Sequence, residues 1–234
     1  ADDAIWYFEE VIRLKKLDPD LGAEGDSDVL AIKGVLNTLT GQKEEGLRYY
    51  ERSLEILTRK VPHRKEKIAT LLHVIGCVYL TMGEYKKAMK IFVASLKARR
   101  AGVGFVHVDV VSTLFNIAFL HQSNKHPEKA FKCLEQALKI LQVRLPDSEK
   151  VALTHAKIGL LAKAMGWSKK AEISFEEALR IRRSIFGDEN EAVADVLVEA
   201  ARVIKHPERP ALAGDGGEIC GVPVPDRLVE GPCP

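Results

Sequence analysis

The stretch GEYKKAMKIFVASLKARR, residues 83–100, decides the fold, because its amphipathic pattern recurs along the chain. A glycine opens it, and Ala88, Phe92 and Ser95 then follow at spacings of four and three, which place them on one face of a helix. Similar stretches lie at residues 126–140 (HPEKAFKCLEQALKI) and 166–183 (GWSKKAEISFEEALRIRR). One amphipathic helix written several times predicts a repeat protein.

Small residues give the period of the repeat. The anchors, spaced 42, 42, 42 and 41 residues apart, are Ala4, Gly46, Ala88, Ala130 and Ala171. Four residues after each anchor stand Phe8, Tyr50, Phe92, Leu134 and Phe175, and seven after stand Val11, Ser53, Ser95, Ala137 and Ala178. Twelve before an anchor stand Gly34, Gly76, Ala118 and Gly159, and five before stand Gly41, Gly83, Lys125 and Gly166. Helices that cross closely need a small residue at the contact, and a bulky residue one turn on fills the gap.

This register predicts antiparallel helix hairpins, with glycine turning the chain between the two helices of each. First helices are expected near 26–40, 66–81, 107–123, 148–164 and 190–205. Second helices are expected near 3–17, 43–59, 84–101, 127–143 and 168–186. One hairpin cannot bury its apolar face alone, so hairpins stack into a solenoid. The predicted fold class is therefore all-α, with the half-repeat 1–17, complete repeats about 26–59, 66–101, 107–143 and 148–186, and a final helix 190–205.

Composition narrows the class of protein. The chain has 234 residues, 46% of them hydrophobic and 29% charged, which is ordinary for a folded domain. A formal net charge of +2 gives no strong field toward nucleic acid or lipid. No run approaches eighteen apolar residues, so no membrane span is expected. Cys77 and Cys133 fall on helical faces and are expected to be small core residues.

The pattern resembles the tetratricopeptide repeat, whose signature is a small residue, Tyr, Gly and then Ala-x3-Phe-x2-Ala. The matching residues are Gly76, Tyr79, Gly83, Tyr85, Ala88 and Phe92. With a period near 42, the chain is similar to the long-repeat subgroup of kinesin light chains and nephrocystin-3-like proteins. The stretches GFVHVDVVSTLFNIAFL (104–120) and ALRIRRSIFGDENEAVADVL (178–197) carry that resemblance. It implies a right-handed superhelical solenoid whose first helices line a concave groove, and it covers roughly residues 3–205.

The resemblance also implies which residues face a partner protein or peptide. These are His73, Cys77, Ser112, Phe115, Asn116, Phe119, Gln122, Lys157, Leu160, Lys163 and Arg202. In relatives, the residue matching Asn116 reads the backbone of an extended peptide, a task that suits a side-chain amide because it both donates and accepts. The equivalent positions hold Ile32, Val74, Lys157 and Glu199, so the chain lacks a ladder of such amides. An aromatic and apolar groove instead indicates a protein contact.

Three further features of the sequence are a basic end of the groove, basic residues on the second helices and a proline-rich C-terminal tail. Lys157, Lys163, Arg202 and Lys205 make one end of the groove basic, which would suit an acidic partner segment or a C-terminal carboxylate. The basic residues of the second helices are interpreted as a solvated face: Lys86, Lys87, Lys90, Lys97, Arg99, Arg100, Arg180, Arg182 and Arg183. Residues 206–234 hold many prolines and no helical period, which predicts an extended tail. Thiols of Cys220 and Cys233 in this tail are expected to be free, with a disulfide as the alternative.

No pattern of an active site, metal site or cofactor site occurs, so no enzyme and no cofactor are expected. The seven histidines are scattered, and none lies four residues from another within a predicted helix. His107 matches the loop histidine of the resembling family and is expected to cap or pack there. Two functions stay open. One is a binding scaffold or adaptor that recruits a partner through the groove, and the other is an accessory subunit built permanently into a large assembly.

The expected compartment is the cytoplasm. Ala1 is not a methionine and falls inside a repeat, so we expect sequence upstream of it, and an organellar address stays open.

Overall fold

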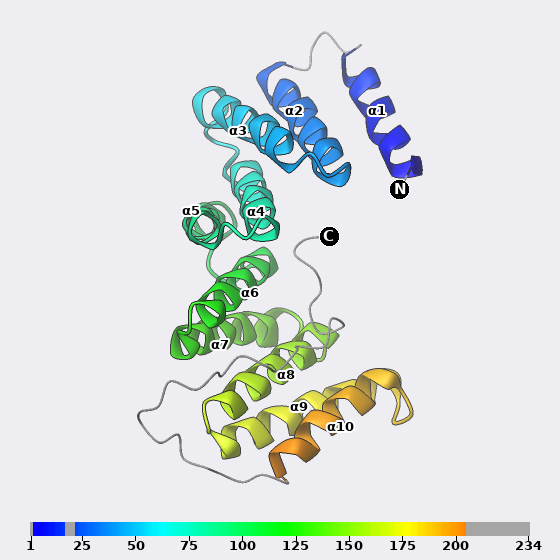
Figure 1. The fold of residues 1–234 in the computed structure, drawn as a ribbon, viewed down its shortest axis with the longest axis vertical. Coiled ribbons are helices and arrows are strands. Elements are labelled where there is room, and N and C mark those ends of the chain that lie inside the picture. The colour runs from blue at the N-terminus through cyan, green and yellow to red at the C-terminus, as the bar shows by residue number, and fades with distance from the viewer. Residues whose placement is uncertain (1, 17–21, 205–234) are drawn as a thin grey trace. The chain divides into compact units, whose positions relative to one another are not determined.

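The computed structural model describes residues 2–16 and 22–204, and these residues form ten α-helices with no strand among them (Figure 1). The predicted all-α fold of antiparallel hairpins is confirmed. The described helices fall into two units, one ending at Phe105 and the other beginning at Val106, and each is described by itself. The predicted extended tail, residues 206–234, lies outside the described residues, and its separation from 1–205 stays a prediction.

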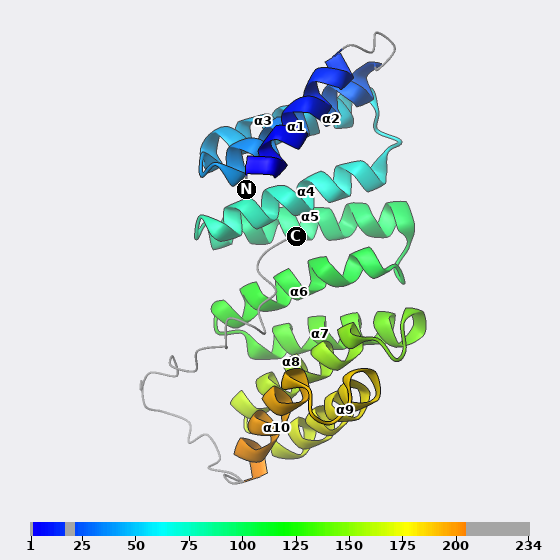
Figure 2. The same cartoon turned by 90° about the vertical axis from the view of Figure 1, so that its right-hand side faces the viewer.

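The first unit holds two hairpins and one further helix. Its helices are α1 (Asp2–Lys16), α2 (Gly22–Leu39), α3 (Lys43–Lys60), α4 (Lys65–Thr81) and α5 (Tyr85–Val103). The hairpins are α2–α3 and α4–α5, and α3 also packs against α4 while α1 packs against α2 (Figure 2). Its core includes Tyr50, Leu57 and Ile75, which are 2%, 3% and 1% exposed.

The second unit also holds two hairpins and one further helix. Here the further helix follows the hairpins, and it is a first helix of the repeat. Its helices are α6 (Val108–Ser123), α7 (Pro127–Arg144), α8 (Glu149–Ala164), α9 (Ser168–Phe186) and α10 (Glu191–Ile204). The hairpins are α6–α7 and α8–α9, and α10 packs on α9 and touches α8. One apolar cluster runs through these helices and includes Ala118, Leu134, Phe175 and Val193.

Close packing in three of the four described hairpins, α2–α3, α4–α5 and α8–α9, depends on a glycine, which has no side chain. A Cβ added to Gly34 would lie 2.5 Å from Cε1 of Tyr50, which is shorter than such contacts allow. The same atom on Gly159 would lie 2.8 Å from Cε1 of Phe175. The aromatic ring therefore occupies the space of the absent side chain, as ridge-into-groove packing of two close helices requires. This explains why the sequence pairs a glycine with an aromatic residue in each of these hairpins.

A buried hydroxyl explains the small residue at the third position of the pattern. Ser95 is 0% exposed, and its Oγ donates to the carbonyl oxygen of Ala69 at 2.8 Å. One repeat earlier, Ser53 Oγ donates to the carbonyl oxygen of Ser27, also at 2.8 Å. A serine here is small enough to let the helices approach, and the bond satisfies its buried hydroxyl.

The turn inside each hairpin uses a left-handed residue at the position five before the anchor. Gly41, Gly83 and Gly166 have φ of 85°, 77° and 72°. Lys125 holds the equivalent position with φ of 58° and is the one non-glycine residue of positive φ among those described. Glycine takes this conformation without strain, whereas a side chain at Lys125 makes it costly.

Two local features refine the predicted boundaries. Helix α2 begins at Gly22, four residues before the range expected from the sequence, and Glu24 lies in its first turn. An acidic side chain there favours the extension, because it faces the positive end of the helix dipole. His107 caps α6, as predicted, since its Nδ1 accepts a hydrogen bond from the backbone N–H of Asp109 at 3.2 Å.

Candidate partner-binding site

Helix α6 carries five of the residues predicted to meet a partner. Ser112, Phe119 and Gln122 are exposed, and Phe115 and Asn116 are half-buried. Their spacing of three and four residues places them along one side of the helix. Phe119 is 43% exposed, and an aromatic side chain on this side offers a large apolar contact area to a partner.

Helix α8 continues this surface in the second unit. Lys157, Leu160 and Lys163 are half-buried, and Leu160 packs against the apolar cluster of the unit. The Nζ atom of Lys157 lies 5.7 Å from the centre of the Phe115 ring, within the range of a cation–π contact. This contact brings α6 and α8 together at one place. We call the surface formed by Ser112, Phe115, Asn116, Phe119, Gln122, Lys157, Leu160 and Lys163 the α6–α8 face.

The two predicted residues on α4, in the first unit, offer less surface. Cys77 is only 4% exposed, so a partner could reach little of its side chain. The ring of His73 is half-buried and lies 5.5 Å from that of Phe92 in an edge-on arrangement, which directs it toward the other helix of its own hairpin. Arg202 lies on α10, and its side chain is outside the described residues.

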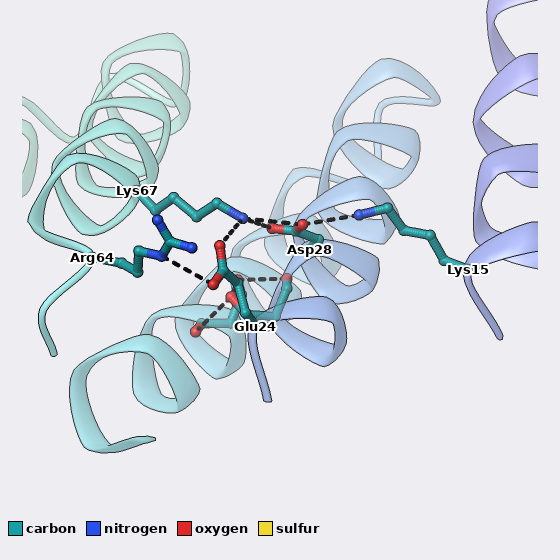
Figure 3. Close-up of polar contacts among 7 residues, drawn as sticks. Lys15, Glu24, Asp28, Arg64 and Lys67 are labelled. Atoms are coloured by element: carbon teal, nitrogen blue, oxygen red, sulfur yellow. Dashed lines mark hydrogen bonds and ion pairs between the residues drawn. The ribbon is translucent and has the colours of Figure 1, made fainter. Parts of the chain in front are cut away.

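A cluster of charges in the first unit was not anticipated from the sequence (Figure 3). The ionic cluster consists of Lys15 on α1, Glu24 and Asp28 on α2, Arg64 just before α4 and Lys67 on α4. Lys67 Nζ lies 2.7 Å from Glu24 Oε1 and 3.0 Å from Asp28 Oδ1. Lys15 Nζ reaches Asp28 Oδ2 at 2.9 Å, and Arg64 Nε reaches Glu24 Oε2 at 3.0 Å. The cluster thus connects α1, α2 and the start of α4 in this unit.

The cluster sets the charges of its members. Burial acts to raise the pKa of the Asp28 carboxyl, but hydrogen bonds from Lys15 and Lys67 outweigh it and hold that pKa below its usual value. Burial acts to lower the pKa of Lys67, but the hydrogen bonds that its ammonium donates to Glu24 and Asp28 outweigh burial and raise that pKa. A hydrogen bond from Lys67 likewise lowers the pKa of Glu24, with a further contribution from Arg64. Glu24, Asp28 and Lys67 are therefore held in their charged forms near neutral pH.

The basic stretches of the second helices are only partly solvated, which corrects the interpretation made from the sequence. Lys86, Lys87, Lys90, Lys97, Arg180 and Arg183 are exposed, but Arg99 is 8% and Arg182 is 4% exposed. Arg182 extends from α9 to the start of the next helix, where its Nη1 donates to the carbonyl oxygen of Ala192 at 2.5 Å. Long aliphatic stems let arginine pack between helices while its head forms hydrogen bonds.

The described residues contain no group of His, Cys, Asp and Glu side chains arranged to hold a metal ion. His155 is half-buried, and burial lowers the pKa of its imidazole, so this residue is neutral at pH 7. None of the helices among the described residues is both long and apolar enough to traverse a lipid bilayer.

Comparison with known proteins places this geometry among helical repeats. The family model described as a tetratricopeptide repeat matches residues 30–101 and 109–184. BtubC (BKLC) from P. vanneervenii is similar in structure, with a TM-score of 0.73 and 18% identity over 87% of this chain and 81% of that chain. A putative kinesin light chain of Podosopora anserina gives a TM-score of 0.65 and 16% identity, over 77% of this chain and 87% of that chain. RapI in its apo form gives a TM-score of 0.70 and 18% identity, over 85% of this chain and 53% of that chain. At these identities the likeness shows the fold alone. A comparison with curated protein sequences gave no match.

Proposed function

Because the chain belongs to the tetratricopeptide repeat family, we propose that it is a non-enzymatic scaffold that binds a partner protein or peptide through its first helices. The α6–α8 face is the proposed contact surface. The observation that carries the proposal is the exposed Phe119 ring on the helix whose Phe115 meets Lys157 of α8. An aromatic anchor surrounded by half-buried apolar and polar groups is the arrangement that dominates binding energy at protein interfaces.

The chemistry of this face favours a partner with both an apolar and an acidic part. Phe119 and Leu160 offer apolar contacts, while Lys157 and Lys163 supply positive charge on the neighbouring helix. Asn116 offers an amide that can pair with a peptide backbone in either sense. His73 and Arg202 stay predicted members of the wider surface, and the small exposed area of Cys77 removes it from the proposed contact set.

Affinity capture followed by mass spectrometry tests the proposal. The wild-type chain and the variants Phe119→Ala and Val143→Ala are used side by side as bait. Val143 is the matched control, because it is 72% exposed but lies on α7, a second helix. We expect Phe119→Ala to lose a specific partner that Val143→Ala retains, while both melt at the temperature of the wild type. Equal recovery of every protein with the two variants would remove the α6–α8 face as the binding site.

A second candidate function is that of an accessory subunit built permanently into a larger assembly. Large apolar side chains outside the α6–α8 face favour it, since Trp6, Val93 and Ile173 are 66%, 52% and 52% exposed and permanent interfaces bury such groups. Purification from the native source separates the two functions. Co-purification at a fixed ratio that survives high salt favours the subunit, whereas a monodisperse monomer that captures short peptides favours the scaffold.

A further inference from the structure

Exposed apolar side chains continue in register from the α6–α8 face onto α10. Val198 holds on α10 the repeat position that Phe115 holds on α6 and Ala156 on α8, and it is 51% exposed. On α6, Phe119 is 43% exposed. Helix α10 packs on α9, touches α8 and ends at Ile204. The rest of the chain therefore leaves the second unit from a helix next to the α6–α8 face.

One segment of the tail has the composition that suits this face. Residues 222–230 (VPVPDRLVE) include two prolines, and their other apolar residues are Val222, Val224, Leu228 and Val229. The acidic residues are Asp226 and Glu230, against one arginine. An apolar and acidic segment is the kind of ligand that the α6–α8 face favours, because Phe119 offers an apolar contact beside the positive charge of Lys157.

The two prolines reduce the number of backbone partners that the segment needs. An extended peptide in a groove must find partners for its N–H and C=O groups, yet the position of Asn116 on α6 is taken by Lys157 on α8. Pro223 and Pro225 carry no N–H, so fewer such partners are required. Proline-rich segments also bind aromatic-lined surfaces well, because their backbone is largely fixed before binding. Phe119 supplies an exposed ring of this kind.

The segment is attached close enough to reach the face. Residues 205–221 separate it from the end of α10, and at about 3.3–3.6 Å per residue a linker of this length spans on the order of 50 Å. Helix α8 has 16 residues, so it is about 24 Å long, and packed helices lie about 8–10 Å apart. Tethering also gives the segment an effective concentration near millimolar, so a contact too weak to hold a free peptide still forms.

We propose that residues 222–230 bind the α6–α8 face of their own chain and compete there with the partner protein. The inference rests on the proposed function, because it assigns a regulator to the same surface. The apolar residues of the segment contact Phe119, and Asp226 pairs with Lys157. A partner then binds only the fraction of chains in which the face is open, which lowers its apparent affinity by that fraction.

Trypsin cleavage of the full chain tests the proposal. Trypsin cuts after arginine, and Arg227 lies within the segment. The rate of cleavage after Arg227, measured by mass spectrometry during brief digestion of the folded chain, reports how often the segment leaves the face. We expect Phe119→Ala to raise this rate roughly tenfold, because it removes the central apolar contact. Val143→Ala, the exposed control on α7, should be cut as the wild type is, and both variants should melt at the wild-type temperature.

Two further comparisons test direct contact between the segment and the face. Lys157→Glu should raise the cleavage rate, because the new carboxylate repels Asp226, whereas Lys139→Glu makes the same change of charge at an exposed position of α7 and should not. Val224→Ser in the segment should raise the rate in the wild-type chain but not further in Phe119→Ala, since the contact is then already lost. Independent, additive effects of these two substitutions would contradict a contact between them.

The failure of this proposal and that of the proposed function give different results. Equal cleavage of the wild type and Phe119→Ala would overturn the tail contact, while a partner lost from Phe119→Ala in affinity capture would keep the proposed function. Faster cleavage of Phe119→Ala with no partner lost would keep the tail contact and remove the proposed function. Protection of Arg227 that falls on dilution would also overturn the proposal, because the segment would then bind a second copy rather than its own chain.

Discussion

A Cβ atom added to Gly76 would lie 2.7 Å from Cε1 of Phe92, so the ring fills the space that a side chain on the facing helix would need. Both residues are buried, and Phe92 is 0% exposed. The α4–α5 hairpin therefore depends on a matched pair of one absent and one large side chain, and the pair recurs as Gly34 with Tyr50 and Gly159 with Phe175.

We expect Gly76→Ala to lower the free energy of unfolding by up to about 2 kcal/mol. Overpacking at the crossing costs ~1–3 kcal/mol, and the better helix propensity of alanine offsets about 1 kcal/mol of it. Urea denaturation of the two single variants Gly76→Ala and Phe92→Leu and of the double variant checks the mechanism. The smaller leucine leaves room for the new methyl, so the double variant should lose less stability than the sum of the singles. Strict additivity would show that the methyl and the ring do not collide.

Lys125 should be replaceable by glycine with a gain in stability. Its φ of 58° places a side chain in the left-handed region, which costs roughly 1–2 kcal/mol. Glycine removes that strain, but it also raises the conformational entropy of the unfolded chain, which offsets part of the effect. The free energy of unfolding should therefore increase by about 0.5–1 kcal/mol. Gly83→Ala, at the equivalent turn, should change stability in the opposite direction. Urea midpoints measure both, and a Lys125→Gly variant no more stable than the wild type would contradict the assigned strain.

The fold was predictable from the sequence because its determinants are local and repeated. The spacing of Ala88, Phe92 and Ser95 defines a helix face, and the 42-residue period predicts which faces meet. The glycine turns also follow from local preference, since Gly83 and Gly166 adopt the positive φ that ends one helix and begins its partner. Information of this kind lies within a few residues of each position.

Contacts between distant residues were the part that could not be predicted. Arg180, Arg182 and Arg183 form one basic run in the sequence, yet Arg180 is exposed and pairs with Glu177, whereas Arg182 is buried against the start of α10. The ionic cluster joins Glu24 to Arg64, forty positions apart, and no local pattern indicates that pairing. Within the site, Cys77 was predicted both as a small core residue and as a groove residue, and its 4% exposure agrees with the first of these.

The ionic cluster should make the first unit sensitive to acid through Asp28. The folded state holds the pKa of this carboxyl below its unfolded value, so its stabilising contribution is complete above the unfolded pKa, about 3.9, and is lost as pH falls through the folded pKa. Asp28→Asn should therefore cost about 0.5–1 kcal/mol at pH 7, a value limited by solvent screening of this partly exposed group. At the acidic end of the window the difference from wild type should vanish.

Urea denaturation at several pH values measures this difference, with Asp26→Asn as the control on an exposed neighbouring position of α2. The control should lack the acid-dependent change. A difference for Asp28→Asn that is constant across the acidic range would show that the carboxylate is not stabilised by Lys15 and Lys67.

Lys157 should govern the salt dependence of partner binding if the partner carries an acidic segment. The Phe115 ring lies 5.7 Å from its Nζ and orients the ammonium on the α6–α8 face. Lys157→Gln removes one ion pair worth about 1 kcal/mol at a partly exposed site, which weakens binding roughly fivefold at low salt. Salt screens that pair, so the affinities of variant and wild type should converge as ionic strength rises.

Isothermal titration of the captured partner at several salt concentrations measures the effect. Lys157→Arg keeps the charge and should retain most of the wild-type salt dependence. If Lys157→Gln binds as the wild type does at low salt, the partner makes no acidic contact here and the apolar part of the α6–α8 face, centred on Phe119, accounts for the binding.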